Sequence, residues 1–398
     1  MVFLNSNFFV KPGSWLGLVG GGQLGRMFCH SAQNLGYKVV VLDPSDISPA
    51  VSVADLHIKS SYDDKNGLER LSSICKSVTI EFENIPFSSL EFLSKRNVLT
   101  PTASSVAIAQ NRIFEKNFIS SLNVDVAPYK VIVNKTDCDL IDHDFFPGIL
   151  KVAKLGYDGK GQVTVREKKE LKDKFVFLGE VPCVLEKFLS LDREISVVVA
   201  RNLDGDCVVF PPAINFHECG ILSSSVVTRS NHEIYDNTCF SEVCSIAKKI
   251  AESLNYYGVL CVEFFVVDNN IIVNEIAPRP HNSGHYSMDA CFTSQFEQQV
   301  RIMSGLPLGN TELLSSSIMI NLLGDVWFGS DGNLIEPDWR KLLSISGLKL
   351  HLYGKEEARR SRKMGHVTLL GNDIYDLDEK AYDLSLILGI NYTKISKV

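Results

Sequence analysis

Hydrophobic and polar residues follow one another along the chain in patterns that predict alternating strands and helices. The segment from Trp15 to Asp43 reads as a strand, a glycine turn, a helix and a second strand, VVVLD, which together make a βαβ unit. Further short strands are expected at 76–80 and 97–100. We therefore expect residues 1–110 to form a small Rossmann-like α/β domain.

The pattern changes after residue 100. Apolar residues at helical spacing predict one amphipathic helix over about 104–122. A strand, a glycine loop, a strand, a basic helix and a strand follow between 147 and 184. Beyond these, strands alternate with one clear helix at about 241–254. This organisation predicts a central domain, 111–190, and a C-terminal domain, 191–398.

Composition and charge limit the class of protein. The 398 residues are 45% apolar and 22% charged, and the net charge of −7 argues against a general nucleic-acid binder, because phosphates attract cationic surfaces. We find no secretory start, and no apolar run approaches the roughly 18 residues that suggest a membrane span. None of the ten cysteines forms a Cys-x-x-Cys pair, which favours reduced thiols. A cytoplasmic protein without a membrane partner is expected.

The first candidate ligand site is the glycine turn from Gly20 to Gly25. It fits G-x-G-x-x-G between a strand and a helix, and Asp43 ends the next strand. Such a turn exposes the N–H groups of a helix N-terminus to an anion. An NAD site, a site for another phosphate, and a tight turn without a ligand all fit this motif.

A second glycine-rich loop, from Gly156 to Gln162, follows the strand that carries Lys151. Its three glycines offer backbone N–H donors and Lys160 adds a positive charge, so the loop can fold over phosphates. A plain β-hairpin is the alternative, although a hairpin requires only one or two glycines. The loop therefore favours a nucleotide site.

Glu263 and Glu275 lie in two predicted strands, CVEFFVV and IIVNEIA, joined by Asp268-Asn269-Asn270. If these three residues form the turn, the two glutamates are directly opposed on one face. Opposed like charges repel, and Mg²⁺ bridging nucleotide phosphates would neutralise them. Two solvated glutamates are the alternative, which the apolar neighbours disfavour. The pair therefore predicts a metal site.

The motifs VGGGQLGRM, EFENIP, GYDGKGQ, EKFL with REIS, VEFFV with NEIAPRPHNSGH, and RKMGH, in this order, resemble the ATP-grasp superfamily. Within it they are similar to the 5-(carboxyamino)imidazole ribonucleotide synthetases, from about Trp15 to Leu370. The resemblance implies a three-domain ATP-grasp architecture, α/β and α+β, with the Rossmann-like domain first. It also implies ATP-dependent carboxylation of 5-aminoimidazole ribonucleotide by bicarbonate, through carboxyphosphate, in purine biosynthesis.

The resemblance carries a nucleotide site over to this chain. Its residues are Arg112, Lys151, Gly156, Tyr157, Asp158, Gly159, Lys160, Gly161, Gln162, Glu186, Lys187, Phe188, Leu189, Glu194, His217, Asn274 and Glu275. The segment 186–189 would recognise adenine through its backbone, and Glu194 would hold the ribose. Glu263 and Glu275 would hold Mg²⁺ or Mn²⁺.

The resemblance also implies roles in the chemistry and in binding the second substrate. Arg279 and His281 would reach bicarbonate and carboxyphosphate, with Tyr157 and Lys151 as further catalytic residues. The ribonucleotide would contact Gln23, Leu24, Glu83, Asp158, Asn215, Asn282, Lys355, Arg362 and Lys363. A structural role for His281, and a solvated basic face around Arg362, are the alternatives. The chain departs from the family pattern at Asn111, Val152, Ala153, Ile214 and Ser361.

Other classes stay open from the sequence alone. A formate-dependent glycinamide ribonucleotide transformylase has a similar layout, and a non-catalytic nucleotide-binding protein would keep the fold. An NAD dehydrogenase is the third alternative. The form of NEIAPRPHNSGH with GYDGKGQ favours the carboxylase, whose partners would be ATP, bicarbonate and the ribonucleotide. Because that family is usually dimeric, a homodimer is expected.

Overall fold

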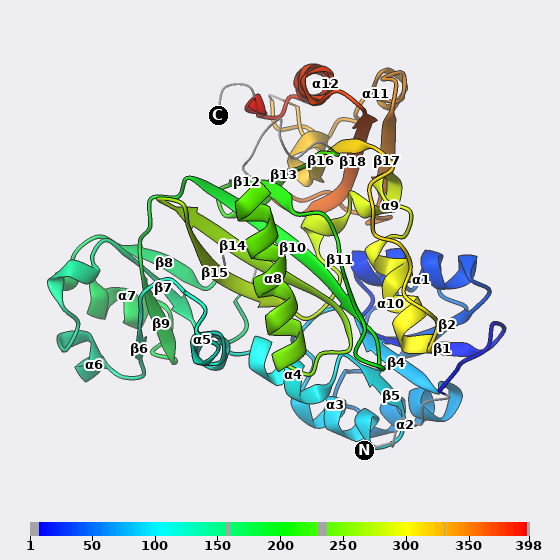
Figure 1. Ribbon diagram of the computed structural model, residues 1–398, viewed down its shortest axis with the longest axis horizontal. Coiled ribbons are helices and arrows are strands. Elements are labelled where there is room, and N and C mark those ends of the chain that lie inside the picture. Colours follow the sequence, from blue (N-terminus) through cyan, green and yellow to red (C-terminus); the bar gives the residue numbers. More distant parts are fainter. Residues whose placement is uncertain (1–7, 157–159, 230–236, 330, 396–398) are drawn as a thin grey trace.

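The computed structural model describes residues 8–156, 160–229, 237–329 and 331–395, which build three sheets (Figure 1). The N-terminal sheet is parallel and has the order β3-β2-β1-β4-β5. Its strands are β1 (Trp15–Val19), β2 (Lys38–Asp43), β3 (Leu56–Lys59), β4 (Ser77–Ile80) and β5 (Val98–Thr100). Helices cover both faces, so its central strands are continuously apolar and buried. The predicted βαβ unit is confirmed.

The helices of this region are α1 (Gln23–Asn34), α2 (Lys65–Ile74), α3 (Phe87–Ser94), α4 (Ala103–Ala109) and α5 (Arg112–Ser121). The prediction of one helix over 104–122 is wrong, because the chain breaks between α4 and α5. There Asn111 caps α5 by accepting the Ile113 N–H at 3.0 Å. The amide of Gln110 donates to the backbone oxygens of Glu83 and Ile85, which fixes the break against the N-terminal domain.

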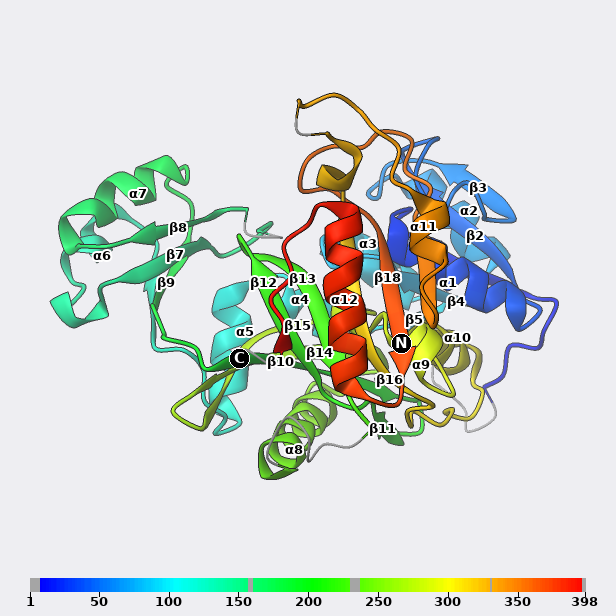
Figure 2. The ribbon, with the colours of Figure 1, turned by 90° about the horizontal axis from the view of Figure 1, so that it is seen from above.

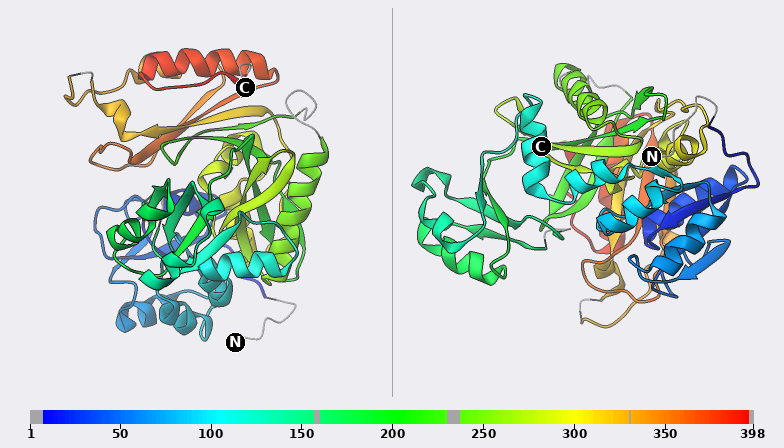
Figure 3. Two further views of the ribbon diagram at one scale, coloured as in Figure 1. Left: turned by 90° about the vertical axis from the view of Figure 1, so that its left-hand side faces the viewer. Right: turned by 90° about the horizontal axis from the view of Figure 1, so that it is seen from below.

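The central domain is a four-stranded antiparallel sheet of order β6-β9-β7-β8. Its elements are β6 (Tyr129–Ile132), α6 (Lys135–Asp139), η1 (His143–Phe145), β7 (Gly148–Val152), β8 (Gln162–Val165), η2 (Lys168–Glu170), α7 (Leu171–Phe177) and β9 (Cys183–Lys187). Helices α6 and α7 pack on it around a small core of its own. Figure 3 shows this domain projecting to one side of the molecule, with the N-terminal sheet on the other.

The largest sheet is antiparallel, with the order β15-β14-β10-β12-β13-β16-β18-β17 and β11 beside β10. Its strands are β10 (Arg193–Arg201), β11 (Cys207–Val209), β12 (Ala213–Glu218), β13 (Ile221–Val227), β14 (Gly258–Val267), β15 (Asn270–Ala277), β16 (Ser316–Leu323), β17 (Leu348–Leu352) and β18 (Lys363–Gly371). The hairpin of β12 and β13 had no predicted counterpart.

Helices cover this sheet at two places. They are α8 (Asn237–Ser253), α9 (Ser287–Ala290), α10 (Gln295–Ser304), α11 (Trp339–Leu343) and α12 (Ile374–Leu388), with short turns η4 (Asn282–Gly284) and η5 (Gly324–Trp327). Helix α8 packs on β10 and β14 through one apolar core. Helix α12 lies over β16 and β18, as Figure 2 shows from above.

One buried side chain joins the N-terminal sheet to the large sheet. The Gln299 amide on α10 accepts the Val259 N–H at 2.8 Å and donates to the Thr79 hydroxyl at 2.9 Å. Because strands β4 and β14 bind the same amide, the two sheets are held in a fixed relation.

Within the described stretches no helix is long and apolar enough to cross a bilayer. All ten cysteines lie in the described residues, and none of them forms a disulfide there.

Candidate functional site

A cavity of about 600 Å³ opens where the three sheets meet. Residues predicted for nucleotide, metal or substrate line it from all three parts of the chain. They are Gln23, Leu24, Glu83, Arg112, Lys151, Gly156, Gln162, Glu194, His217, Glu263, Asn274, Glu275, Arg279, His281, Asn282 and Lys363. The structure thus brings together groups that lie more than 300 positions apart in the sequence.

The two predicted metal ligands are paired across β14 and β15, since Glu263 lies opposite Glu275. The predicted three-residue turn is wrong, because Val267 pairs with Asn270 and the turn has two residues, both at positive φ. That turn alone would place Asn274 opposite Glu263. A β-bulge at Asn274 restores the opposition of the two glutamates.

The two carboxyls of this pair have very different environments. Burial would raise the pKa of Glu275, but Arg112, whose Nη1 is 2.8 Å from Oε2, lowers it to about 2. Burial and the negative charge of Glu275 raise the pKa of Glu263 to about 7. Glu275 is therefore charged at neutral pH, whereas Glu263 becomes fully charged when a cation neutralises the pair.

The donor set fits a hard divalent cation. Besides the opposed carboxyls, the buried Oδ1 of Asn274 has no hydrogen-bond partner among the described residues. Oxygen ligands of this kind suit Mg²⁺, which also keeps phosphate oxygens and water in its coordination shell. Glu263, Asn274 and Glu275 are thus the residues that could hold it, at the cavity wall.

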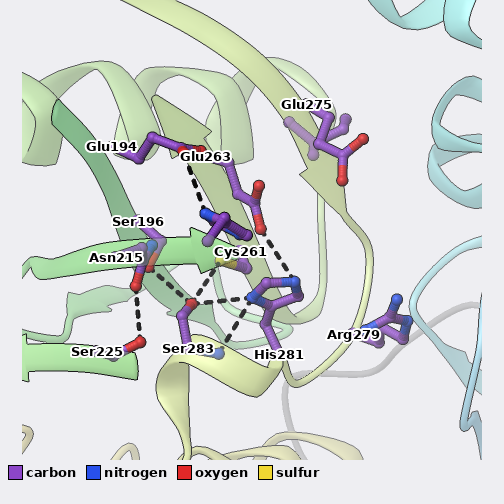
Figure 4. Close-up of polar contacts among 12 residues, drawn as sticks. Glu194, Ser196, Asn215, Ser225, Cys261, Glu263, Glu275, Arg279, His281 and Ser283 are labelled. Atoms are coloured by element: carbon purple, nitrogen blue, oxygen red, sulfur yellow. Dashed lines mark hydrogen bonds and ion pairs between the residues drawn. The ribbon is translucent and has the colours of Figure 1, made fainter. Parts of the chain in front are cut away.

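Arg279 follows β15, four residues after Glu275, and points toward the N-terminal domain (Figure 4). Its Nε donates to Oε2 of Glu83 at 2.6 Å, which crosses from the large sheet to the N-terminal domain. Burial would lower the pKa of the guanidinium, but the charges of Glu83 and Glu81 raise it. Arg279 therefore stays cationic beside the carboxylate pair.

His281 stands between these groups. Its Nε2 is 3.1 Å from Oε1 of Glu263. Burial, and next the charge of Arg279, lower the pKa of this imidazole to about 3. His281 is therefore neutral, and its contact with Glu263 is not a pairing of opposite charges.

Lys151 is held by a buried cluster that the sequence did not suggest. Its Nζ is 2.8 Å from Oε2 of Glu186, and Nζ of Lys116 is 3.0 Å from Oε1 of the same carboxylate. Burial would raise the pKa of Glu186, but the two lysines hold it below its usual range. Two lysines on one carboxylate leave a net positive charge beside the cavity, which suits phosphates.

Glu194 and His217 form an ion pair, 3.1 Å apart, at the junction of this cavity with a second one of about 540 Å³. Burial would lower the pKa of His217, but Glu194 raises it above its usual value. The predicted substrate residue Asn215 lines only the second cavity, and its Oδ1 accepts a hydrogen bond from Ser225 at 2.7 Å. The structure therefore does not bring Asn215 to the main cavity.

The glycine turn is filled by the protein itself. The Gly21 N–H donates to Asp43 at 2.7 Å and the Leu24 N–H to Glu81 at 3.2 Å. A Cβ on Gly22 would stand 2.4 Å from the Glu81 carboxylate, so glycine permits that close approach. Asp43 also accepts the Tyr62 hydroxyl at 2.7 Å. With these groups already paired, the turn does not present the phosphate and ribose contacts of an NAD site.

Several predicted residues lie away from the wall of the main cavity or outside the described stretches. Tyr157, Asp158 and Gly159 are outside the described residues. The predicted residues that do not line the cavity are Lys160, Gly161, Glu186, Lys187, Phe188, Leu189, Asn215, Lys355 and Arg362. Lys355 donates to the backbone oxygen of Lys363, and Arg362 to that of Glu357.

Sequence reasoning missed three charged residues at the cavity or behind it: Glu81, Glu115 and Lys116. Glu115 lines the cavity and accepts the Ile276 N–H at 2.6 Å, and burial raises the pKa of its carboxyl to about 8. Glu115 and Lys116 lie on the predicted amphipathic helix, where charged residues on the apolar face would have been the signal. Glu81 is signalled by its place directly after a buried strand.

Comparison with known families agrees with this geometry. A ribonucleotide synthetase preATP-grasp domain matches residues 14–110, and an ATP-grasp domain matches 117–296. A phosphoribosylaminoimidazole carboxylase C-terminal domain matches 317–380. Fold and site thus define a ligase of the ATP-grasp class.

Individual relatives narrow the class. N5-carboxyaminoimidazole ribonucleotide synthase of Bacillus subtilis is 40% identical over 92% of this chain and 93% of its own length. The synthetase of Staphylococcus aureus complexed with ADP superposes with a TM-score of 0.87, at 37% identity, over 97% of this chain and 100% of that chain. A synthase from Aspergillus clavatus in complex with ADP and 5-aminoimidazole ribonucleotide superposes with a TM-score of 0.84. It is 26% identical, over 94% of this chain and 98% of that chain. This chain belongs to the N5-carboxyaminoimidazole ribonucleotide synthase family, which confirms the resemblance found in the motifs.

Proposed function

We propose that the protein carboxylates 5-aminoimidazole ribonucleotide with bicarbonate and ATP, giving N5-carboxyaminoimidazole ribonucleotide, ADP and phosphate in purine biosynthesis. The observation that carries the proposal is the opposed pair Glu263 and Glu275, with Arg279 and His281, in one cavity that reaches the N-terminal domain at Glu83. Membership of the synthase family supports the choice of substrates. The protein would act in the cytoplasm as a homodimer.

The chain's own residues account for the first half of the reaction. A bicarbonate oxygen attacks the γ-phosphorus of ATP, ADP leaves, and carboxyphosphate forms. Arg112 and Lys151 place positive charge at the cavity wall, with Lys116 buried behind Glu186, and this charge would offset that of the phosphates. Mg²⁺ held by Glu263 and Glu275, or Mn²⁺ in its place, would neutralise further phosphate charge when bound.

The second half of the reaction would use the side of the cavity that borders the N-terminal domain. Carboxyphosphate breaks into CO₂ and phosphate, and the exocyclic amine attacks CO₂ and then loses a proton. Arg279 is positioned to hold the carboxyphosphate, and Gln23, Leu24 and Lys363 line the side where the ribonucleotide would lie. With domain boundaries near 110 and 190, the nucleotide and the ribonucleotide would lie at different junctions of the same cavity.

The test is ADP release from ATP, Mg²⁺ and bicarbonate, with and without 5-aminoimidazole ribonucleotide. We expect stimulation by that ribonucleotide, loss of stimulation in Glu275→Ala, and no effect of Glu69→Ala, which removes an exposed glutamate from α2. Labelled bicarbonate should appear in the product. Stimulation by glycinamide ribonucleotide with formate instead would support the transformylase, and bound ATP that no substrate combination hydrolyses would support a binding protein.

A further inference from the structure

A buried chain of hydrogen bonds runs behind His281, away from the cavity (Figure 4). The Ser196 hydroxyl on β10 donates to the Ser283 hydroxyl on η4 at 2.7 Å. The Ser283 Oγ is 2.9 Å from Nδ1 of His281, whose Nε2 faces Glu263 at 3.1 Å. The side chains of Ser196 and Ser283 are almost completely buried. None of the sequence motifs assigned these two serines a role.

One bond in this chain fixes the direction of the others. The backbone N–H of Ser283 donates to Nδ1 of His281 at 3.4 Å, and a backbone N–H is only a donor. Nδ1 is therefore the unprotonated nitrogen, and the ring hydrogen of the neutral imidazole is on Nε2. The Ser283 hydroxyl accepts from Ser196, so its own hydrogen is available for Nδ1. Every donor in the chain thus points toward Glu263.

We infer that Ser283 and Ser196 are positioning residues that hold the protonated Nε2 of His281 against Oε1 of Glu263, which would orient this carboxylate toward the divalent cation that Glu263 and Glu275 would hold. Hydrogen bonds behind a ligating carboxylate orient it, and losing them typically costs about 10–100-fold in metal affinity. The inference rests on the proposed function for its biological use, but its geometry stands on the hydrogen bonds alone.

The backbone of this segment is fixed independently of the serine hydroxyls. The Gln295 side chain accepts the His281 N–H at 2.9 Å and donates to the His281 carbonyl at 2.7 Å. The Cys261 thiol lies 3.8 Å from the Ser283 hydroxyl, a weaker contact. Removing the Ser283 hydroxyl should therefore leave the backbone at 281–283 in place and free only the imidazole of His281 to rotate. This makes Ser283→Ala a specific test.

The experiment has two readouts on the metal-free and Mn²⁺-loaded protein. In protein with ¹⁵N-labelled histidine, the ring nitrogens of His281, assigned by their loss in His281→Gln, should show Nε2 protonated and Nδ1 not. Ser283→Ala should produce a mixture of tautomers and weaken Mn²⁺ binding in the presence of ADP by about 10–100-fold. Ser196→Ala should have a smaller effect in the same direction. Ser77→Ala removes a buried hydroxyl bonded to Val98 in another sheet and should change neither readout.

Two outcomes would overturn the inference: a proton on Nδ1 of His281 in the unmodified protein, or Mn²⁺ affinity within twofold of normal in folded Ser283→Ala. The first is measured on the unmodified protein and uses a variant only to assign the His281 signals, so it decides even if Ser283→Ala does not fold. Neither readout requires turnover. If the ribonucleotide fails to stimulate ADP release but both readouts behave as expected, the proposed function fails and this inference stands.

Discussion

Two pairs of carboxylates lie at or near the cavity, and they differ in which groups of the protein contact them. At the glycine turn, Glu81 and Asp43 accept N–H groups of the turn and of the start of α1, so the acids and the donors satisfy each other. At the hairpin of β14 and β15, Glu263 and Glu275 face each other, and Arg112 pairs with only one of the two. Both stretches looked like ligand sites in the sequence. The comparison teaches that acids satisfied by backbone N–H groups have little need of a ligand, whereas two opposed acids favour a cation between them.

The largest loss of activity should follow from removing the negative charge of Glu275, the hairpin carboxylate that pairs with Arg112. Glu275→Gln keeps the shape of the side chain but removes the carboxylate, so we expect ADP release to fall by roughly a hundredfold or more. Steady-state ADP release at saturating substrates measures it. A decrease of less than tenfold in folded protein would show that the hairpin is not the metal site and that the contrast between the two pairs is mistaken.

At the glycine turn we expect a loss of stability instead of activity. Gly22→Ala places a Cβ 2.4 Å from the Glu81 carboxylate, which should destabilise the fold by about 1–3 kcal/mol. Urea unfolding measures the free energy, and the KM for ATP should stay unchanged. In a Glu81→Ala background the same substitution should cost clearly less, because the clashing side chain is gone. An equal cost in both backgrounds would contradict this account of the turn.

Glu263→Gln should stabilise the protein in metal-free buffer at pH 8, by less than Gly22→Ala destabilises it. Directly opposed like charges destabilise a strand pair, so neutralising one should raise the free energy of unfolding by about 0.5–1 kcal/mol. The same variant should lose Mg²⁺-dependent ADP release. Glu69→Gln, on an exposed helix face, is the control for a change of net charge. A metal-free protein destabilised by Glu263→Gln would mean that the pair is already neutralised internally.

The smallest effect concerns pH and the ion pair of His217 with Glu194. The pKa of His217 is raised in the folded protein, so its charged form stabilises the fold. This stabilisation is complete below the unfolded pKa of about 6.5 and is lost as pH rises through the folded value. At pH 6 the His217→Gln variant should therefore have a lower free energy of unfolding than the unmodified protein. At pH 9 the two free energies should be nearly equal. A constant difference between the two pH values would assign the effect to packing.

The regular elements were predictable where local patterns are strong, and less so elsewhere. The βαβ unit and the strands β14 and β15 follow from runs of buried apolar residues. The strand β13 was missed because ILSSSVV looks polar, yet Ser225 is buried and donates to Asn215 on the next strand. The break between α4 and α5 was missed because it depends on Gln110 binding the N-terminal domain. Periodicity carries no information about such distant partners.

The sequence by itself determined the family, the nucleotide motifs and the identity of the two opposed acids, because these depend on residue types at short spacing. Only the tertiary structure decided which acids are satisfied by backbone N–H groups and which face another acid. It closed the glycine turn with Glu81, set the register of the acids through a bulge at Asn274, and moved Asn215 to another cavity. The reason is physical: whether a charge can bind a ligand depends on what surrounds it, and those neighbours come from remote parts of the chain.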